Sequence, residues 1–139
     1  MRRKEGFTLV ELLIVLAVIA ALLATITPVA LNAVKRAKAT QVALNLRNIK
    51  TAVEQYVYTE QLATPSNLTL DSLTSANYLS RTPENYDLEI SNWSGGSAIA
   101  TVVYTGEDVD VDMVVDSYQD AETIGSTGVR IVFNIAKYW

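Results

Sequence analysis

The sequence predicts an α+β protein in which one long N-terminal helix packs on a C-terminal antiparallel β-meander of about four strands. The first part of the chain is almost purely apolar and then becomes an amphipathic pattern with helical spacing, with no Gly or Pro between residues 29 and 64. The last third contains runs in which apolar and polar residues alternate, separated by breaks rich in Gly and Ser. A length of 139 residues leaves room for one folded domain.

The apolar block predicts a membrane-spanning segment over residues 7–34. Charged residues are absent from Leu12 to Val34, a run of 23 residues, and a helix needs about 20 apolar residues to cross a bilayer. A cleaved secretory signal would be shorter. A buried core helix would need an equally apolar cover, which no later segment provides. The basic residues before the block should keep the N-terminus in the cytoplasm and place the C-terminal part outside; they are Arg2, Arg3 and Lys4.

The second half of the predicted helix is amphipathic, over residues 35–59. Its apolar residues recur at steps of three and four and form one stripe: Ala39, Val42, Leu46, Ile49, Val53 and Tyr56. Together with the first half, this gives a helix of about 50 residues, or about 80 Å. A stripe this narrow needs a cover, so we expect the following domain to pack on it.

The remaining chain divides into a connecting loop over residues 60–85 and a sheet head over residues 86–139. Within the loop we expect a helical turn near Leu70–Leu79, capped by Asp71 or Ser72. Four strand-like runs follow, with apolar residues at alternate positions or throughout: Tyr86–Ile90, Ile99–Tyr104, Val109–Met113 and Val129–Ile135. A four-stranded meander is the simplest topology, with its apolar face on the Val42–Tyr56 stripe.

Composition excludes several kinds of chemistry. The chain has no Cys and no His, so it has no disulfide, no thiolate metal site and no histidine base. A net charge of −4 argues against direct nucleic-acid binding. No convergent nucleophile and base are visible, which disfavours an enzyme, and the sequence predicts no catalytic residue and no cofactor.

Three carboxylates at alternate positions, Asp108, Asp110 and Asp112, have two interpretations. They could chelate Ca²⁺, but the loop lacks the Gly and Glu that an EF-hand requires, because Met113 and Gln119 occupy those positions. Alternation on a strand would place all three on one solvated face, which is the interpretation we favour. No metal site is therefore predicted.

The start of the chain resembles the class III signal of type IV pilins and pseudopilins. The resemblance rests on Gly6-Phe7-Thr8-Leu9-Val10-Glu11-Leu12, preceded by a short basic leader and followed by an uncharged apolar run. It implies that a prepilin peptidase removes the leader, residues 1–6, by cutting after Gly6, and that the new N-terminal residue, Phe7, is N-methylated. It also implies that Pro28 interrupts the helix, as a proline often does at this place in the family.

Glu11 is the one carboxylate at the edge of the apolar run. Its carboxylate could extend to the membrane interface, or it could pair with a cationic group within an assembly. Cleavage after Gly6 would create a cationic amine on Phe7. Our hypothesis is that Glu11 of one subunit pairs with the Phe7 amine of a neighbour and so sets the register of packing helices.

Pro28 removes the helical partner of the Ala24 carbonyl. The hydroxyls of Thr25 and Thr27 are near enough in sequence to satisfy freed backbone groups. An ordinary kinked membrane helix is one interpretation. The resemblance implies the other, a stretch that loosens when subunits leave the bilayer.

A basic cluster, Lys35, Arg36 and Lys38, follows the apolar run. It could bind lipid headgroups or acidic surfaces of other subunits, since residues 60–139 carry three basic and twelve acidic side chains. Many pilins close their C-terminal region with a disulfide, and this chain cannot. Its head must therefore rely on an apolar core that includes Tyr138 and Trp139.

The resemblance implies a structural subunit of a type IV pilus-like filament for adhesion, twitching motility or DNA uptake. Its implied partners are further copies of itself, the prepilin peptidase, an inner-membrane assembly platform with cytoplasmic ATPases, and membrane lipid before assembly. The chain would first span the inner membrane once and later lie in an extracellular pilus. Two alternatives stay open: a pseudopilin in a periplasmic pseudopilus of a secretion or competence system, and a single-pass membrane protein with an external binding domain.

Overall fold

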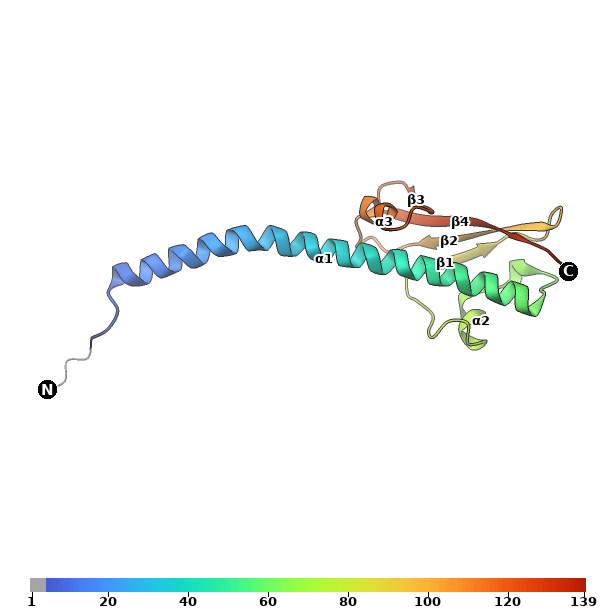
Figure 1. Cartoon of the computed structure of the whole chain (residues 1–139), viewed down its shortest axis with the longest axis horizontal. Helices are drawn as coiled ribbons and strands as arrows, with labels where there is room; N and C mark the ends of the chain where they lie inside the picture. The colour runs from blue at the N-terminus through green and yellow to red at the C-terminus, as the bar shows by residue number, and fades with distance from the viewer. Residues whose placement is uncertain (1–4) are drawn as a thin grey trace. The chain divides into compact units, whose positions relative to one another are not determined.

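The computed structural model describes residues 5–139, in two compact units that divide after Lys35. The predictions for the basic residues of the leader, within residues 1–4, lie outside the described part of the chain. One helix, α1 (Leu9–Glu60), has 52 residues and contributes to both units (Figure 1). The prediction of one long helix is confirmed.

The first unit consists of the apolar half of α1 and the residues before it. All of its large apolar side chains, from Phe7 to Val34, are exposed in the single chain. Within residues 5–139, α1 is the one helix long and apolar enough to cross a membrane. The chain stays helical through Pro28. The hydroxyls of Thr25 and Thr27 donate to the carbonyls of Leu22 (2.8 Å) and Leu23 (2.7 Å). They therefore do not satisfy the Ala24 carbonyl, which is the group that Pro28 leaves without its helical partner.

The second unit, Arg36–Trp139, contains a four-stranded antiparallel sheet beside the second half of α1 (Figure 1). Its strands are β1 (Tyr86–Ile90), β2 (Ser97–Tyr104), β3 (Ala121–Ile124) and β4 (Gly128–Ala136). Their order is β1-β2-β4-β3, so the simple meander that we expected is wrong. A meander would place β3 between β2 and β4, whereas β4 pairs with β2 along eight residues and β3 lies at the edge.

One predicted strand is wrong. Residues around Val109–Met113 do not pair in the sheet, and Val111–Ser117 forms the helix α3. The Asp110 side chain accepts a hydrogen bond from the Met113 N–H at 3.4 Å and so caps this helix, while Val114 is buried. The alternating pattern of Asp and Val concealed a capping residue followed by apolar residues at helical spacing. The fourth strand is instead β3.

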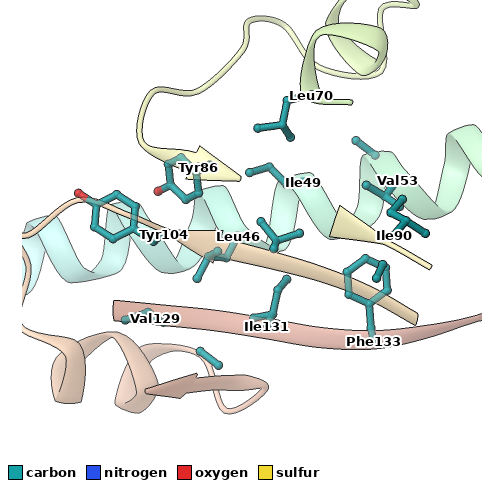
Figure 2. Close-up of a cluster of buried hydrophobic side chains, with 14 of the residues drawn as sticks. Leu46, Ile49, Val53, Leu70, Tyr86, Ile90, Tyr104, Val129, Ile131 and Phe133 are labelled. Atoms are coloured by element: carbon teal, nitrogen blue, oxygen red, sulfur yellow. The ribbon is translucent and has the colours of Figure 1, made fainter. Parts of the chain in front are cut away.

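The core lies between α1 and the sheet, as the amphipathic stripe predicts. The buried residues of α1 are Ala39, Val42, Ala43, Leu46, Ile49, Ala52, Val53 and Val57. Inward-facing residues of the sheet meet them, among them Ile131 and Phe133 of β4 (Figure 2). Tyr56, the last residue of the predicted stripe, is only half-buried.

The connection between α1 and the sheet contains a 3-10 turn, η1 (Pro65–Asn67), and a short helix, α2 (Leu70–Ser75). The predicted helical turn in this region is confirmed, but its cap is Thr69, whose hydroxyl accepts from the Ser72 N–H at 3.2 Å. Leu73 of α2 is fully buried and anchors the connection to the core.

Aromatic residues hold the C-terminus to the end of α1. The Trp139 ring lies 5.5 Å from that of Trp93 and 5.1 Å from that of Tyr138, both edge-on. The Tyr138 hydroxyl donates to the Tyr58 carbonyl at 2.9 Å. We call Tyr58, Trp93, Tyr138 and Trp139 the C-terminal aromatic cluster. It closes the head in the absence of a disulfide.

Candidate assembly site

The N-terminal end of α1 is a capping box built by Thr8 and Glu11. The Thr8 N–H donates to Oε2 of Glu11 at 2.9 Å, and the Glu11 N–H donates to Oγ1 of Thr8 at 3.2 Å. Two of the backbone donors that a helix leaves unpaired at its start are thereby satisfied. Both side chains are exposed, and the uncharged apolar stretch of α1 begins directly after Glu11.

This arrangement leaves Glu11 able to bind a cation. Its Oε1 atom accepts no hydrogen bond from any of residues 5–139. The helix dipole places partial positive charge at this end of α1, next to the Glu11 side chain. Phe7 directly precedes the cap, and its side chain is 92% exposed. The site can thus hold a negative charge at the edge of an apolar surface and offer one free oxygen to an ammonium group.

Gly6 lies outside α1, in an open stretch of chain. A Cβ atom at this position would meet no other atom within 4 Å, and the backbone is not in the left-handed region. The fold of the single chain therefore does not require glycine at residue 6. A requirement for it must come from a partner that binds this segment.

Thr8 was not among the predicted site residues. The signal that could have found it is the spacing of a hydroxyl residue and a glutamate three positions later, directly before an apolar run. We expected Glu11 either to reach the membrane interface or to pair with a cation in an assembly, whereas the structure also gives it a local backbone partner.

We predict that Thr8→Val weakens the first turn of α1, because valine keeps the shape of threonine but cannot accept the Glu11 N–H. Loss of a capping side chain costs about 1 kcal/mol, which corresponds to about fivefold faster amide exchange. Hydrogen exchange of the first turn in detergent-solubilised precursor measures this. Thr8→Ser should exchange like the wild type, and equal rates in all three chains would contradict the capping role.

The exposed apolar surface of the first unit is the second feature of the site. Soluble monomers rarely expose continuous apolar patches of more than a few hundred Å². Here every large apolar residue from Phe7 to Val34 is exposed, over more than six helical turns. Such a surface needs a bilayer or the same surface of other copies as its cover.

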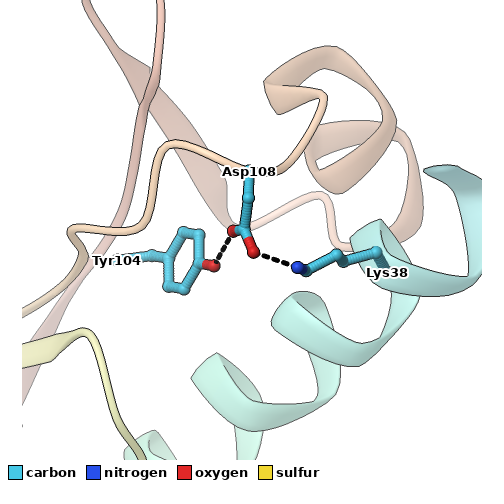
Figure 3. Close-up of polar contacts among 3 residues, drawn as sticks. All are labelled: Lys38, Tyr104 and Asp108. Atoms are coloured by element: carbon cyan, nitrogen blue, oxygen red, sulfur yellow. Dashed lines mark hydrogen bonds and ion pairs between the residues drawn. The ribbon is translucent and has the colours of Figure 1, made fainter.

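In the head, one member of the predicted basic cluster already has a partner in its own chain. Lys38 of α1 forms an ion pair with Asp108, which follows β2, and the Tyr104 hydroxyl donates to the same carboxylate at 2.5 Å (Figure 3). The hydrogen bonds from Lys38 and then from Tyr104 hold the pKa of Asp108 below its ordinary value. Burial, followed by the bond to Asp108, raises the pKa of Tyr104.

The predicted interpretation of the three carboxylates on one strand face is therefore wrong. Asp108 pairs with Lys38, Asp110 caps α3, and Asp112 lies in the first turn of that helix. Among residues 5–139 no group of three or more metal-ligating side chains comes together. Asp108 and Asp110 each serve the local fold, and the three residues do not share one strand face.

We predict that Asp108→Asn lowers the thermal stability of the head at pH 7 by a few degrees. The lowered pKa of Asp108 means that its ion pair stabilises the fold above the ordinary pKa of 3.8 and is lost as the pH falls through the lower, folded value. Fluorescence of Trp93 and Trp139 during heating measures unfolding. The difference between the two chains should shrink below pH 3.8, and a difference independent of pH would contradict the ion pair.

Comparison with known proteins gives one family model and one relative that match this chain. Residues 1–27 match a family model described as the prokaryotic N-terminal methylation motif. The chain is 37% identical over 106 residues to PilA4, the major component of the type IV wide pilus of Thermus thermophilus. This match covers 76% of the present chain and 78% of that relative, so it extends well into the head. No solved structure matches.

Proposed function

The chain belongs to the type IV pilin family, whose members are structural proteins that form filaments, and we propose that it is the major subunit of a type IV pilus. Its similarity to a major pilus component over most of both chains supports this role over that of a pseudopilin. The observation on which the proposal depends most is the first unit, a wholly exposed apolar helix that begins with a single carboxylate.

Processing is the first step of the proposed function. The methylation motif implies cleavage by a prepilin peptidase. We place the cut between Gly6 and Phe7 and the methyl group on the Phe7 amine. The open chain around Gly6 supports this, because a protease needs an extended and accessible segment.

Pairing of Glu11 with the Phe7 amine is the second step. The amine stays cationic with one methyl group, and the free Oε1 atom of Glu11 can accept from it while Oε2 keeps the cap. Within one helix Glu11 is already turned toward Thr8, so we place the amine of a neighbouring copy at Oε1. This pair would align each subunit along the filament axis.

Before assembly, the apolar half of α1 spans the membrane. We propose the inner membrane, with the N-terminus in the cytoplasm and the head outside, and extraction by an assembly platform. Thr25 and Thr27 satisfy carbonyls of the turn before Pro28 in the single chain. Pro28 is where we expect the helix to loosen when lipid is replaced by other subunits.

Mass spectrometry of the protein from its native cell tests the proposal. We expect a mature chain that begins at Phe7 and carries one extra methyl group, and only full-length precursor when the peptidase is deleted. Electron microscopy should then show long surface filaments made mainly of this chain. Filaments that are short and confined to the periplasm would indicate a pseudopilin instead.

A further inference from the structure

A groove lies along one flank of α1 in the head, where residues 78–83 of the connection run beside the helix. Its volume is about 380 Å³. The lining on the α1 side is rich in uncharged hydrogen-bonding groups: Asn45, Asn48, Thr51 and Gln55. Arg81 lies on the opposite wall and is the only charged residue in the lining.

The wall formed by residues 78–83 is held in place from behind. The N–H groups of Tyr78 (2.9 Å) and Leu79 (3.2 Å) both donate to the Leu73 carbonyl at the end of α2. The Tyr78 ring packs edge-on against Tyr56 of α1, with centroids 5.1 Å apart. The groove is therefore preformed in the single chain, which reduces the entropy lost when it is filled.

The free groups in the groove include one cation, Arg81, and two side-chain amides, which can donate and accept hydrogen bonds. Asn48 and Gln55 make no side-chain hydrogen bond, and Arg81 no ion pair, with any residue in the described range 5–139. Asn45 is already engaged, with Gln41 and with the Tyr86 hydroxyl. Arg81 favours an occupant with negative charge, and the amide N–H groups can donate to it; carboxylates accept from both.

The opposite flank of the head carries unpartnered carboxylates. Helix α3 packs against β3 and β4, at the edge of the sheet farthest from β1. Asp112 and Asp116 lie four residues apart on its exposed face, and neither forms an ion pair within residues 5–139. Arg36 lines the same cavity as Asp116, but no ion pair joins them. Two like charges at this spacing repel, so a cationic partner would stabilise them.

We propose that α3 of one copy docks into this groove of the next, with Asp112 and Asp116 meeting Arg81 and the amides of Asn48 and Gln55. The inference rests on the proposed function, because it describes how heads contact one another in a filament. The groove and α3 lie on different flanks, so the contact is heterologous: each copy offers its groove to one neighbour and its helix to another. Such a contact does not pair off into two-fold dimers, and it continues into an open polymer when its rotation does not close a ring.

Cysteine cross-linking in native filaments tests this contact, and the chain offers a clean background because it has no Cys. Asn48→Cys combined with Asp116→Cys should give, after mild oxidation, a ladder of covalent dimers, trimers and higher multimers. The matched control combines Asn48→Cys with Asp87→Cys, an exposed carboxylate on β1. A ladder no stronger than that of the control, or one that stops at the dimer, would overturn the proposal.

Charge reversal gives a second readout. Arg81→Asp should reduce the yield of sheared filaments about tenfold. The new carboxylate at position 81 would repel Asp112 and Asp116 of the neighbouring copy. Adding Asp116→Arg to the same chain should restore the yield to within about twofold of the wild type, and failure to do so would contradict the pairing. If the wild-type chain itself forms no filament, the proposed function fails; if it forms filaments without these effects, only the docking contact fails.

Discussion

Replacing Glu11 with Ala should leave the chain in the membrane and remove filaments from the cell surface. The mature Phe7 amine would then lie in apolar surroundings without a counter-charge. Removing one partner of a buried ion pair costs about 3–5 kcal/mol, and a filament repeats that cost at every subunit. Immunoblots should find the chain in the membrane fraction at wild-type abundance, while the sheared fraction should fall to background.

Glu11→Gln separates the two roles of this residue. Glutamine can accept the Thr8 N–H and so keeps the capping box, but it carries no charge. We expect this variant to start α1 normally and still to fail in assembly. Wild-type filaments from Glu11→Gln, with none from Glu11→Ala, would show that the cap matters and the ion pair does not.

Replacing Leu46 with Ala should destabilise the head by about 2–5 kcal/mol, a large share of the about 5–15 kcal/mol that a domain commonly has. Leu46 is fully buried between α1 and the sheet, where the truncated side chain leaves a cavity (Figure 2). Urea unfolding of the detergent-solubilised chain, followed by fluorescence of Trp93 and Trp139, measures the loss.

Leu44→Ala is the matched control for the core. Leu44 lies two positions earlier on the same helix but is 49% exposed. The same change there should alter the free energy of unfolding by about 0.5 kcal/mol or less. Equal effects at Leu44 and Leu46 would mean that the head does not bury the predicted face of α1.

The features that follow from local periodicity could be predicted from the sequence. The apolar run up to Val34 is long enough for a membrane helix, and the stripe from Ala39 to Val53 has the period of a helix, so each gives one continuous signal. Three of the four predicted strands exist, and the local pattern that predicted them is apolar residues at alternate positions or throughout. Strand β3 escaped prediction because it has four residues and buries only Ala121.

The rest could not be predicted, because it depends on residues far apart in the chain or on competing local bonds. Lys38 and Asp108 are 70 residues apart, and only the folded head brings them together. Around Asp110, alternating residues predicted a strand, but the bond from the Met113 N–H to the Asp110 side chain caps a helix instead. The alternating pattern does not reveal this bond. At the assembly site, the motif around Gly6 and Glu11 led to the family, while the bond between Thr8 and Glu11 required the structure.

The C-terminal aromatic cluster has a consequence for how and where this protein can be made. Because ring contacts and one hydroxyl secure the chain end, no oxidase or thiol isomerase is needed as the head folds. Its folding is independent of the redox potential of its surroundings. Polymers of this chain should keep their strength in strongly reducing sediments or in reagents that would open a cystine-closed head.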